Sequence, residues 1–245
     1  QVVFGSYAKL EQRRICGQAD LLYHKGNLFL CLVVELPDGT PINPKGTIGV
    51  DMGIINIATD SDGNSFSGKQ VDIVREKTTA IKAKLQSCGS KSAKRHLKKL
   101  SRKEAHFKRN INHIISKKIV RLAKDTSRQI ALEELKGFND RQTVRKVQRE
   151  QFGKWAFNQL RQFIEYKAMI AGIPVILINP KNTSRRCSQC GHIEKANRKS
   201  QSEFVCKHCN FSLNADVNAA KNISYLASVK MPIVASSSTR IADVA

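Results

Sequence analysis

Alternating hydrophobic and polar positions near the start of the chain predict β-structure. Residues 18–36 alternate on both sides of the turn HKGN, which is typical of a β-hairpin. A Pro- and Gly-rich stretch ends near residue 45, and an apolar run follows over residues 47–60. This run predicts a buried strand that the turn SDGN reverses into a short return strand. We therefore expect two units: the hairpin of a β-domain whose earlier strands are absent, and a sheet that begins after residue 45.

The hydrophobic pattern becomes helical after the return strand. Between residues 75 and 128, Ile and Leu recur at helical spacing, and the string SCGS predicts a hinge between two helices. The short β-rich run QIALEEL follows. An amphipathic stretch with Trp155 and Leu160 on its apolar face predicts a further helix, which Gly172 ends.

The last part of the pattern completes an α/β order. PVILINP predicts a buried strand and DVNAAKNISYLAS a final helix, whereas the unpatterned residues beyond Lys230 predict a disordered tail. Strands and helices in this succession favour a mixed sheet with flanking helices. At 245 residues, the chain is long enough for one main domain with smaller attachments.

The charge balance indicates a polyanionic partner. Lys and Arg number 42 against 20 Asp and Glu, a net charge of +22, and nucleic acid is the commonest partner of such a surface. An anionic membrane is the alternative, but the chain has no apolar run of 18 residues and no signal peptide, so we expect no membrane partner. The cysteines do not form a disulfide framework, which predicts a reducing, cytoplasmic location.

The two central helices carry most of this charge. Residues 75–128 hold 18 Lys or Arg against 3 Asp or Glu. A solvated helix face stabilised by surface pairs would alternate Lys with Glu, and this one does not. We therefore predict a phosphate-binding surface with a steep salt dependence. The candidate residues are Lys98, Lys99, Arg102, Lys103, Lys108 and Arg109.

Four cysteines near the C-terminus predict a metal site. Two C-x-x-C pairs are separated by fifteen residues, a spacing typical of a structural tetrahedral Zn²⁺. The loop between the pairs is polar and Lys-rich, which argues against free thiols in a core. His192 and His208 are substitutes if one cysteine is not a ligand. Basic residues of this segment, among them Arg185, Arg186 and Arg198, are further candidates for nucleic-acid contacts. The predicted ligands are Cys187, Cys190, Cys206 and Cys209.

Three acidic residues stand where predicted elements could converge. Asp51 lies within the first apolar strand, Glu133 ends the next strand, and Asp216 opens the last helix. A carboxylate within an apolar strand is costly to bury unless it is paired or holds a metal. Such a cluster suits Mg²⁺ and two-metal phosphodiester hydrolysis. The alternatives remain open: Asp51 pairing with a buried Arg, Glu133 capping a helix or facing water, and Asp216 serving as a helix N-cap.

The strings VDMGI, ALEEL, CSQCG…CKHC and NADVNAAKNI, in this order, resemble the TnpB (OrfB) family of insertion-sequence proteins, relatives of the type V CRISPR nucleases. The resemblance covers residues 20–227 and implies an RNase H-like (RuvC) nuclease fold with the zinc ribbon inserted before the last acid. By motif match, Asp51, Glu133 and Asp216 are the first, second and third catalytic metal-binding acids, for Mg²⁺ with Mn²⁺ as the alternative. Glu134 departs from the Asp that many relatives have.

The resemblance also implies a domain order and partners. Residues 1–45 correspond to the closing strands of a β wedge domain, 46–183 to the nuclease core with the basic insertion at 75–128, 184–212 to the zinc ribbon, 213–227 to the last core helix and 228–245 to a disordered tail. The chain lacks most of the N-terminal wedge and recognition regions, so we expect a truncated protein. Implied partners are DNA and a guide RNA transcribed from the transposon end.

Two functional hypotheses follow. The first is a transposon-encoded, RNA-guided DNA endonuclease that uses the Asp/Glu/Asp triad. The second is a non-cleaving protein, either a zinc-ribbon nucleic-acid binder or a guide-dependent DNA-binding regulator. The intact triad favours the nuclease, because a catalytically dead relative is expected to lose one of its carboxylates. Strand transfer by a tyrosine nucleophile is less favoured, because no tyrosine stands in a suitable setting.

Overall fold

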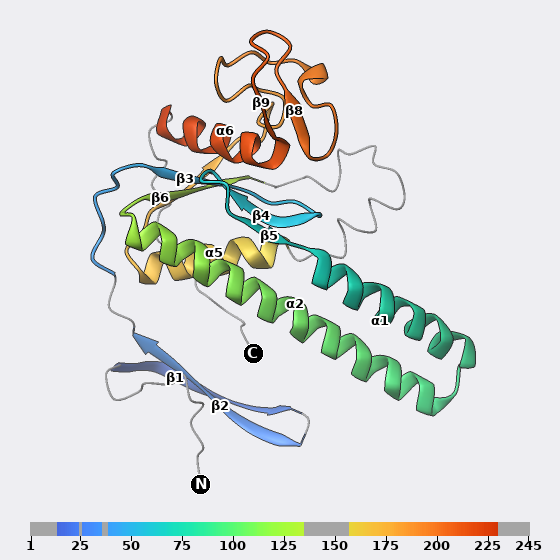
Figure 1. Cartoon of the computed structure of the whole chain (residues 1–245). Helices are drawn as coiled ribbons and strands as arrows, with labels where there is room; N and C mark the ends of the chain where they lie inside the picture. The colour runs from blue at the N-terminus through green and yellow to red at the C-terminus, as the bar shows by residue number, and fades with distance from the viewer. Residues whose placement is uncertain (1–13, 25, 36–38, 135–156, 230–245) are drawn as a thin grey trace.

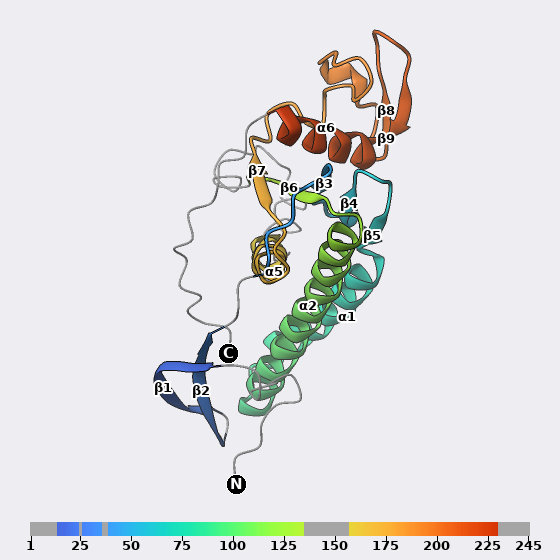
Figure 2. The same ribbon diagram turned by 90° about the vertical axis from the view of Figure 1, so that its left-hand side faces the viewer.

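A long antiparallel hairpin opens the structured part of the chain. The structure, a computed structural model, describes residues 14–24, 26–35, 39–134 and 157–229. Strands β1 (Arg14–His24) and β2 (Asn27–Glu35) pair along their length and stand apart from the other elements in Figures 1 and 2. Apolar side chains such as Leu21 and Leu28 are 65% and 67% exposed. The predicted hairpin is confirmed.

A five-stranded mixed sheet forms the centre of the molecule. Its strands are β3 (Thr47–Asp51), β4 (Asn56–Asp60), β5 (Ser65–Ser67), β6 (Gln129–Glu133) and β7 (Val175–Ile178), in the order β5-β4-β3-β6-β7. The first three are antiparallel neighbours, and β3, β6 and β7 are parallel. The mixed sheet is confirmed. One placement was wrong: Asp51 ends β3 rather than lying within a longer strand, because the chain leaves the sheet until Asn56.

The two central helices form a hairpin of their own. Helix α1 (Lys69–Cys88) and helix α2 (Lys91–Asp125) are joined by a tight turn. Gly89 adopts a left-handed φ of 63°, and the Ser90 hydroxyl accepts a hydrogen bond from the backbone N–H of Ala93 at 3.1 Å. The predicted hinge is confirmed, but the first of the two helices begins at Lys69, earlier than the predicted start near residue 75.

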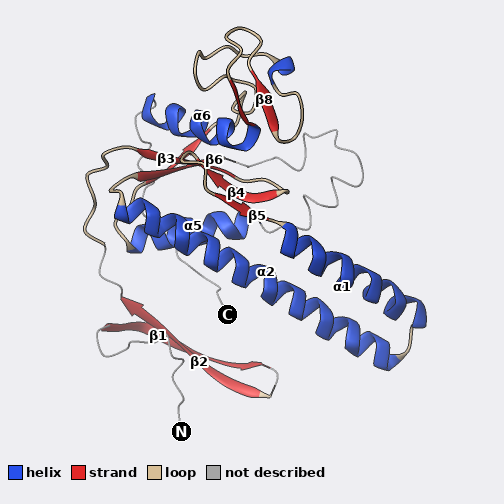
Figure 3. Cartoon of the chain, viewed as in Figure 1, coloured by secondary structure: helices blue, strands red, loops and turns tan. Residues whose placement is uncertain are grey.

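Helices cover both faces of the sheet. In Figures 1 and 3, α2 and α5 (Phe157–Ile170) lie on one face and α6 (Ala215–Val229) crosses the other. Buried residues of β3, β6, α2 and α5 form the main core, which includes Ile48, Ile119, Leu132 and Leu160. No helix within the described ranges is both long and apolar enough to cross a membrane. Trp155 and residues 230–245 of the predicted tail lie outside the described residues, whereas Ser228 and Val229 still belong to α6.

Candidate active site and metal centre

The pairing of two parallel strands brings Asp51 and Glu133 to one edge of the sheet. Val50 of β3 is paired with Leu132 of β6, and each acid is the next and last residue of its strand. Neighbouring strands lie about 4.8 Å apart, so the two acids start from adjacent backbone positions. Glu133 accepts a hydrogen bond from the Thr183 hydroxyl at 2.6 Å.

Helix α6 carries Asp216 across the end of β3. The helix lies close against Gly49, where an added Cβ would come within 2.1 Å of the Ala220 carbonyl oxygen. The Ser224 hydroxyl donates to the Thr47 carbonyl at 2.8 Å and fixes the crossing. Asp216 lies about one helical turn before Ala220, toward the end of β3 that carries Asp51.

The N-cap of α6 leaves the Asp216 carboxylate available. The Asn214 side-chain oxygen accepts hydrogen bonds from the backbone N–H groups of Asp216 and Val217, at 3.0 and 3.3 Å. Asn214 therefore makes the capping contact that was the alternative role of Asp216.

The other two acids act electrostatically on the Asp51 carboxyl. Burial, followed by the negative charges of Glu133 and Asp216, raises the pKa of Asp51 to about 8, and the Arg198 guanidinium partly offsets this. Burial also raises the pKa of Glu133, although the hydrogen bond from Thr183 opposes the change. Asp51 keeps some solvent contact, but protein atoms enclose most of it. Loss of hydration and neighbouring negative charge thus both disfavour the ionised form of Asp51.

Two side chains contact Asp216 from different parts of the fold. The Asn56 side-chain amide, at the start of β4, donates to Asp216 Oδ2 at 2.9 Å. An Arg198 guanidinium nitrogen lies 3.8 Å from Asp216 Oδ1. The same guanidinium is held by the backbone carbonyls of Ser200 and Gln201. Arg198 thus reaches from the cysteine-rich segment to the acidic residues.

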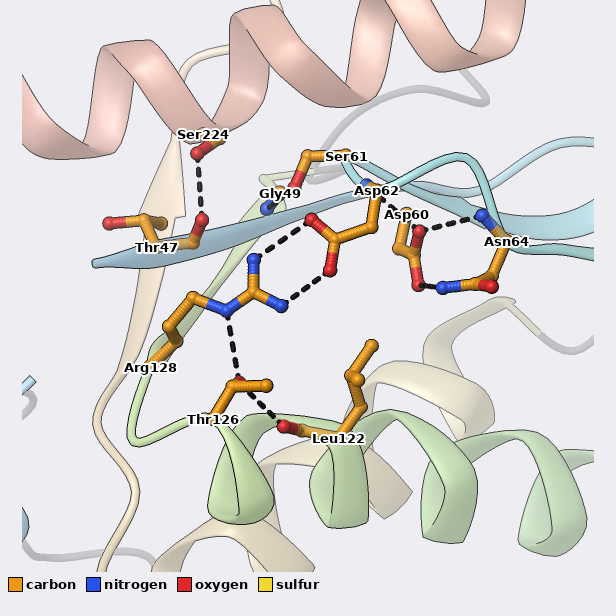
Figure 4. A network of polar contacts seen from close by, with 10 residues as sticks. All are labelled: Thr47, Gly49, Asp60, Ser61, Asp62, Asn64, Leu122, Thr126, Arg128 and Ser224. Carbon is orange, nitrogen blue, oxygen red and sulfur yellow. Dashed lines mark hydrogen bonds and ion pairs between the residues drawn. The ribbon is translucent and has the colours of Figure 1, made fainter. Parts of the chain in front are cut away.

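A polar network holds the β4–β5 turn behind this site (Figure 4). The Arg128 guanidinium binds both carboxylate oxygens of Asp62, and one of these contacts is 2.8 Å. Asp60 accepts from the backbone and the side chain of Asn64, both at 2.8 Å. The hydroxyl of Ser61 accepts from the Gly49 N–H at 3.3 Å. These contacts tie the turn to β3, so Asp60 and Asp62 are structural, as expected of hairpin residues.

The four predicted cysteines lie together in one cluster. Their sulfur atoms lie within 4.8 Å of one another, and the cluster is the only such group of Cys, His, Asp or Glu among the described residues. The Sγ atoms of Cys187 and Cys209 are 3.8 Å apart, and those of Cys190 and Cys206 are 3.6 Å apart. Tetrahedral ligation with Zn–S bonds of about 2.3 Å separates sulfurs by about 3.8 Å, so the donor set fits a metal ion.

Each cysteine pair forms a tight turn. The N–H of Gly191 donates to the Cys187 carbonyl, and the N–H of Asn210 donates to the Cys206 carbonyl, at 2.9 and 3.0 Å. Gly191 and Asn210 have φ values of 79° and 57°, the left-handed conformation that Gly and Asn adopt at least cost. The rings of His192 and His208 stack with centroids 5.4 Å apart, but neither belongs to the cluster.

Buried asparagines of α6 attach the cysteine segment to the sheet. The Asn218 and Asn222 amides both donate to the Arg186 carbonyl, at 2.8 and 2.7 Å, and Asn222 also donates to the Thr183 carbonyl. Because Thr183 contacts Glu133, the helix, the acid and the start of the cysteine segment form one connected unit. Strands β8 (Glu203–Val205) and β9 (Ser212–Asn214) complete the segment.

The predicted basic residues fall into different environments. Lys108 pairs with Glu104 at 2.8 Å, and Arg186 stacks on Tyr225 with 4.9 Å between the guanidinium carbon and the ring centroid. Lys99 and Lys103 line a hollow of about 480 Å³ on α2, together with Ser92, Arg95, His96 and Leu100. The remaining candidates, Lys98, Arg102, Arg109 and Arg185, are exposed or half-buried.

Sequence reasoning missed Asn56 and Thr183 as neighbours of the acids. Neither residue carries a local signal, because their partners are 160 and 50 positions away. Arg198 was named only as one of several basic residues of the cysteine segment. Its place directly after Asn197, which is buried and binds three backbone groups of that segment, becomes evident only in the structure.

Comparisons with known families match two regions of the chain. Residues 31–137 match the OrfB_IS605 family, described as a probable transposase, and residues 157–223 match the Cas12f1-like TNB domain. A TnpB-like protein of Methanocaldococcus jannaschii is 30% identical over 208 residues, which cover 78% of this chain and 73% of that protein. The putative RNA-guided DNA endonuclease InsQ of Escherichia coli is 31% identical, over 81% of this chain and 53% of InsQ.

Longer relatives share the same region. The CRISPR-associated endodeoxyribonuclease Cas12f1 of Syntrophomonas palmitatica is 29% identical, over 82% of this chain and 49% of its own length. A cryo-EM structure of a Cas12f1–sgRNA–target DNA complex aligns with a TM-score of 0.61 at 22% identity, over 84% of this chain and 55% of the solved chain. The fold is therefore shared with Cas12f1. The chain spans about half the length of Cas12f1 and InsQ.

Proposed function

This chain belongs to the TnpB (OrfB) family of insertion-sequence proteins, and we propose that it hydrolyses DNA phosphodiester bonds as an RNA-guided endonuclease. The observation that carries the proposal is the placement of Asp51 and Glu133 at the ends of two paired strands, with Asp216 near enough for its charge, after burial and Glu133, to raise the pKa of Asp51. Three elements distant in sequence deliver carboxylates to one edge of the sheet. A bound cation would relieve the repulsion among these carboxylates.

We assign the sheet to an RNase H-like (RuvC) core and the cysteine segment to a zinc ribbon. The order β5-β4-β3-β6-β7, with acids at the ends of the adjacent parallel strands, supports the first assignment. The sulfur separations of 3.6 and 3.8 Å support the second. Four thiolates leave no open position, so the zinc is structural.

Asp51, Glu133 and Asp216 are proposed to hold two Mg²⁺ ions, with Mn²⁺ as the alternative, because carboxylate oxygens suit hard cations. The bound ions would supply an activated water and neutralise charge on the scissile phosphate. The chain contributes position: Asp51 and Glu133 are fixed by strand pairing, and Asp216 by the contact of α6 with β3. Arg198 would bind a non-bridging phosphate oxygen, since it already faces the acidic residues.

The proposed partners are DNA and a guide RNA from the transposon end. The excess of 42 basic over 20 acidic residues supports binding to both polyanions. The name of InsQ describes an RNA-guided DNA endonuclease, and the Cas12f1 complex contains sgRNA and target DNA. The hairpin β1–β2 is assigned to the closing strands of a wedge domain, and its exposed apolar side chains support a covering partner there.

The test is Mg²⁺-dependent cleavage of single-stranded DNA by the purified chain. Asp51→Asn is compared with Asp125→Asn, which changes an exposed acid at the end of α2. We expect cleavage by the wild type and by Asp125→Asn, and a loss of at least about 100-fold in Asp51→Asn. Equal rates for Asp51→Asn and the wild type would contradict the assignment.

A second arm separates a nuclease from a non-cleaving binder. The assay is repeated with guide RNA and with the N-terminal half of a full-length relative supplied. Wild-type protein that binds DNA in a salt-sensitive manner, yet leaves it intact in both arms, would be a guide-dependent or zinc-ribbon binding protein.

A further inference from the structure

Asn56 is the first residue of β4 and lies beside the acidic residues without being one of them. Its side-chain amide donates to Asp216 Oδ2 at 2.9 Å, although 160 residues separate the two. No charged group of β4 takes part in this contact. A neutral donor that binds a carboxylate fixes its orientation and leaves its charge in place.

The backbone holds Asn56 firmly in place. In the sheet, Asn56 is paired with Ser67 of β5. The loop before it is closed by hydrogen bonds from Gly53 N–H to the Ile57 carbonyl and from Gly68 N–H to the Ile55 carbonyl. An added Cβ at Gly53 would approach the Asn56 carbonyl to 3.0 Å, so the loop is tightly packed. The amide therefore reaches Asp216 from a fixed point.

The two oxygens of Asp216 have different partners. Oδ2 is bound by Asn56, whereas Oδ1 faces the Arg198 guanidinium at 3.8 Å, a longer contact between charged groups. The positive charge of Arg198 also lowers the pKa of Asp51, so this guanidinium acts on both acids. The tighter, neutral contact thus holds Oδ2, whereas a cation at Oδ1 would replace the longer contact with Arg198.

We propose that Asn56 is a positioning residue that orients the Asp216 carboxylate for binding a divalent cation through Oδ1. The inference rests on the proposed function, because it deepens the role of the same acidic site. Without the amide, the Asp216 carboxylate can rotate about its side-chain bonds. Cation binding must then also fix the orientation of this carboxylate, which weakens the affinity for the cation.

The chain offers a matched control in Asn64. Its amide also donates to a carboxylate, that of Asp60 at 2.8 Å, but within the β4–β5 turn (Figure 4). Asn56→Ala and Asn64→Ala therefore remove the same kind of hydrogen bond inside and outside the proposed site. Asn56→Asp is the second variant, since it keeps the shape of the side chain and replaces the donor with a negative charge.

The primary measurement is the Mg²⁺ concentration that gives half of the full Mg²⁺-induced rise in melting temperature, with the Mg²⁺ midpoint of cleavage as the second readout. We expect Asn56→Ala to raise both midpoints about 10-fold, the effect of one lost hydrogen bond to a charged group. Asn56→Asp should melt below the wild type without Mg²⁺, because its carboxyl faces the Asp216 carboxylate, and should show a changed midpoint. Asn64→Ala should lower the melting temperature and leave both midpoints unchanged.

The outcomes separate the inference from the function on which it rests. Midpoints for both Asn56 variants equal to those of the wild type would make Asn56 merely structural and overturn the inference. A Mg²⁺-induced shift that depends on Asn56, without DNA cleavage by the wild type, would retain the inference and reject the endonuclease. A wild type that shows no Mg²⁺-induced shift would overturn both.

Discussion

At the scale of the residue, burial and neighbouring negative charges both disfavour the ionised form of the Asp51 carboxyl. Its pKa of about 8 arises from loss of hydration first and from Glu133 and Asp216 second. Without a cation, the native chain therefore holds a proton at Asp51 across neutral pH. The unfolded chain does not, because the pKa of an unperturbed Asp is about 3.9. Protons bound only in the native state make its stability fall as pH rises through that window.

Asp51→Asn removes this penalty, and we expect it to stabilise the chain in the absence of added Mg²⁺. The gain in melting temperature should increase steadily from pH 5 to pH 8 and reach at least about 2–4 °C at pH 8, the effect of 1 kcal/mol in a chain of this size. Thermal melting across pH 5–8 provides the measurement. Asp125→Asn is the control, and melting curves of Asp51→Asn and wild type that shift in parallel with pH would contradict the expectation.

At the scale of the element, the placement of Asp216 depends on the contact between α6 and β3. Gly49 allows that contact, since an added Cβ would lie 2.1 Å from the Ala220 carbonyl oxygen and 2.5 Å from the Ser224 nitrogen. Both neighbours are backbone atoms and cannot rotate away. The helix must therefore shift to accept any side chain there.

We expect Gly49→Ala to destabilise the chain by about 1–3 kcal/mol or more, as overpacking does, and to reduce cleavage by displacing Asp216. Gly46→Ala is the matched control, because a Cβ at that position meets only the flexible Arg128 side chain at 3.5 Å. Denaturant unfolding of the two variants measures the difference. Equal unfolding midpoints would show that α6 does not depend on this close approach.

The cysteine segment is the second element whose fold bears on the acids, because it carries Arg198. Cys206→Ser should abolish the binding of one zinc per chain, measured by metal analysis of the purified protein, since three ligands remain. Cleavage should fall with it even though the triad is intact. Cys88→Ser, at an exposed position outside the cluster, should keep its zinc. Full zinc content in Cys206→Ser would exclude that thiol as a ligand.

At the scale of the whole molecule, the net charge of +22 is concentrated on the α1–α2 hairpin. Lys82 and Lys108 are engaged by Glu104 between the helices. Arg95, Lys99 and Lys103 recur every four residues on one side of α2, about 6 Å apart along the helix axis, and make no ion pair within the described part of the chain. This side is therefore the better candidate for contact with phosphates.

Replacing Lys99 and Lys103 together by Ala should weaken binding to single-stranded DNA. It should also make the slope of log K against the logarithm of the salt concentration less steep, by about 0.7 for each lost phosphate contact. The double variant of Lys82 and Lys108 to Ala is the control and should change stability more than the salt slope. The measurement is the binding constant for single-stranded DNA, titrated at several salt concentrations. If the salt dependence changes only in the Lys82 and Lys108 variant, the phosphate-binding surface instead includes the side of the hairpin where these two lysines contact Glu104.

Local pattern and short-range spacing determined much of this protein. The period of Ile and Leu predicted α1 and α2, the apolar runs predicted the strands, and the cysteine spacing predicted the cluster that the structure contains. These features depend on residues that are close in sequence, within about one helical turn or one C-x-x-C turn, so the sequence alone determines them. Membership of the TnpB (OrfB) family followed from the order of such motifs.

Only the tertiary structure decided how distant residues meet. The end of β3 at Asp51, the hydrogen bond from Asn56 to Asp216 and the reach of Arg198 depend on strand register and on the close approach of α6 to Gly49. A contact across 160 residues leaves no periodic trace in the chain. It exists because packing brings two backbones to a fixed separation, and that separation is a property of the folded molecule.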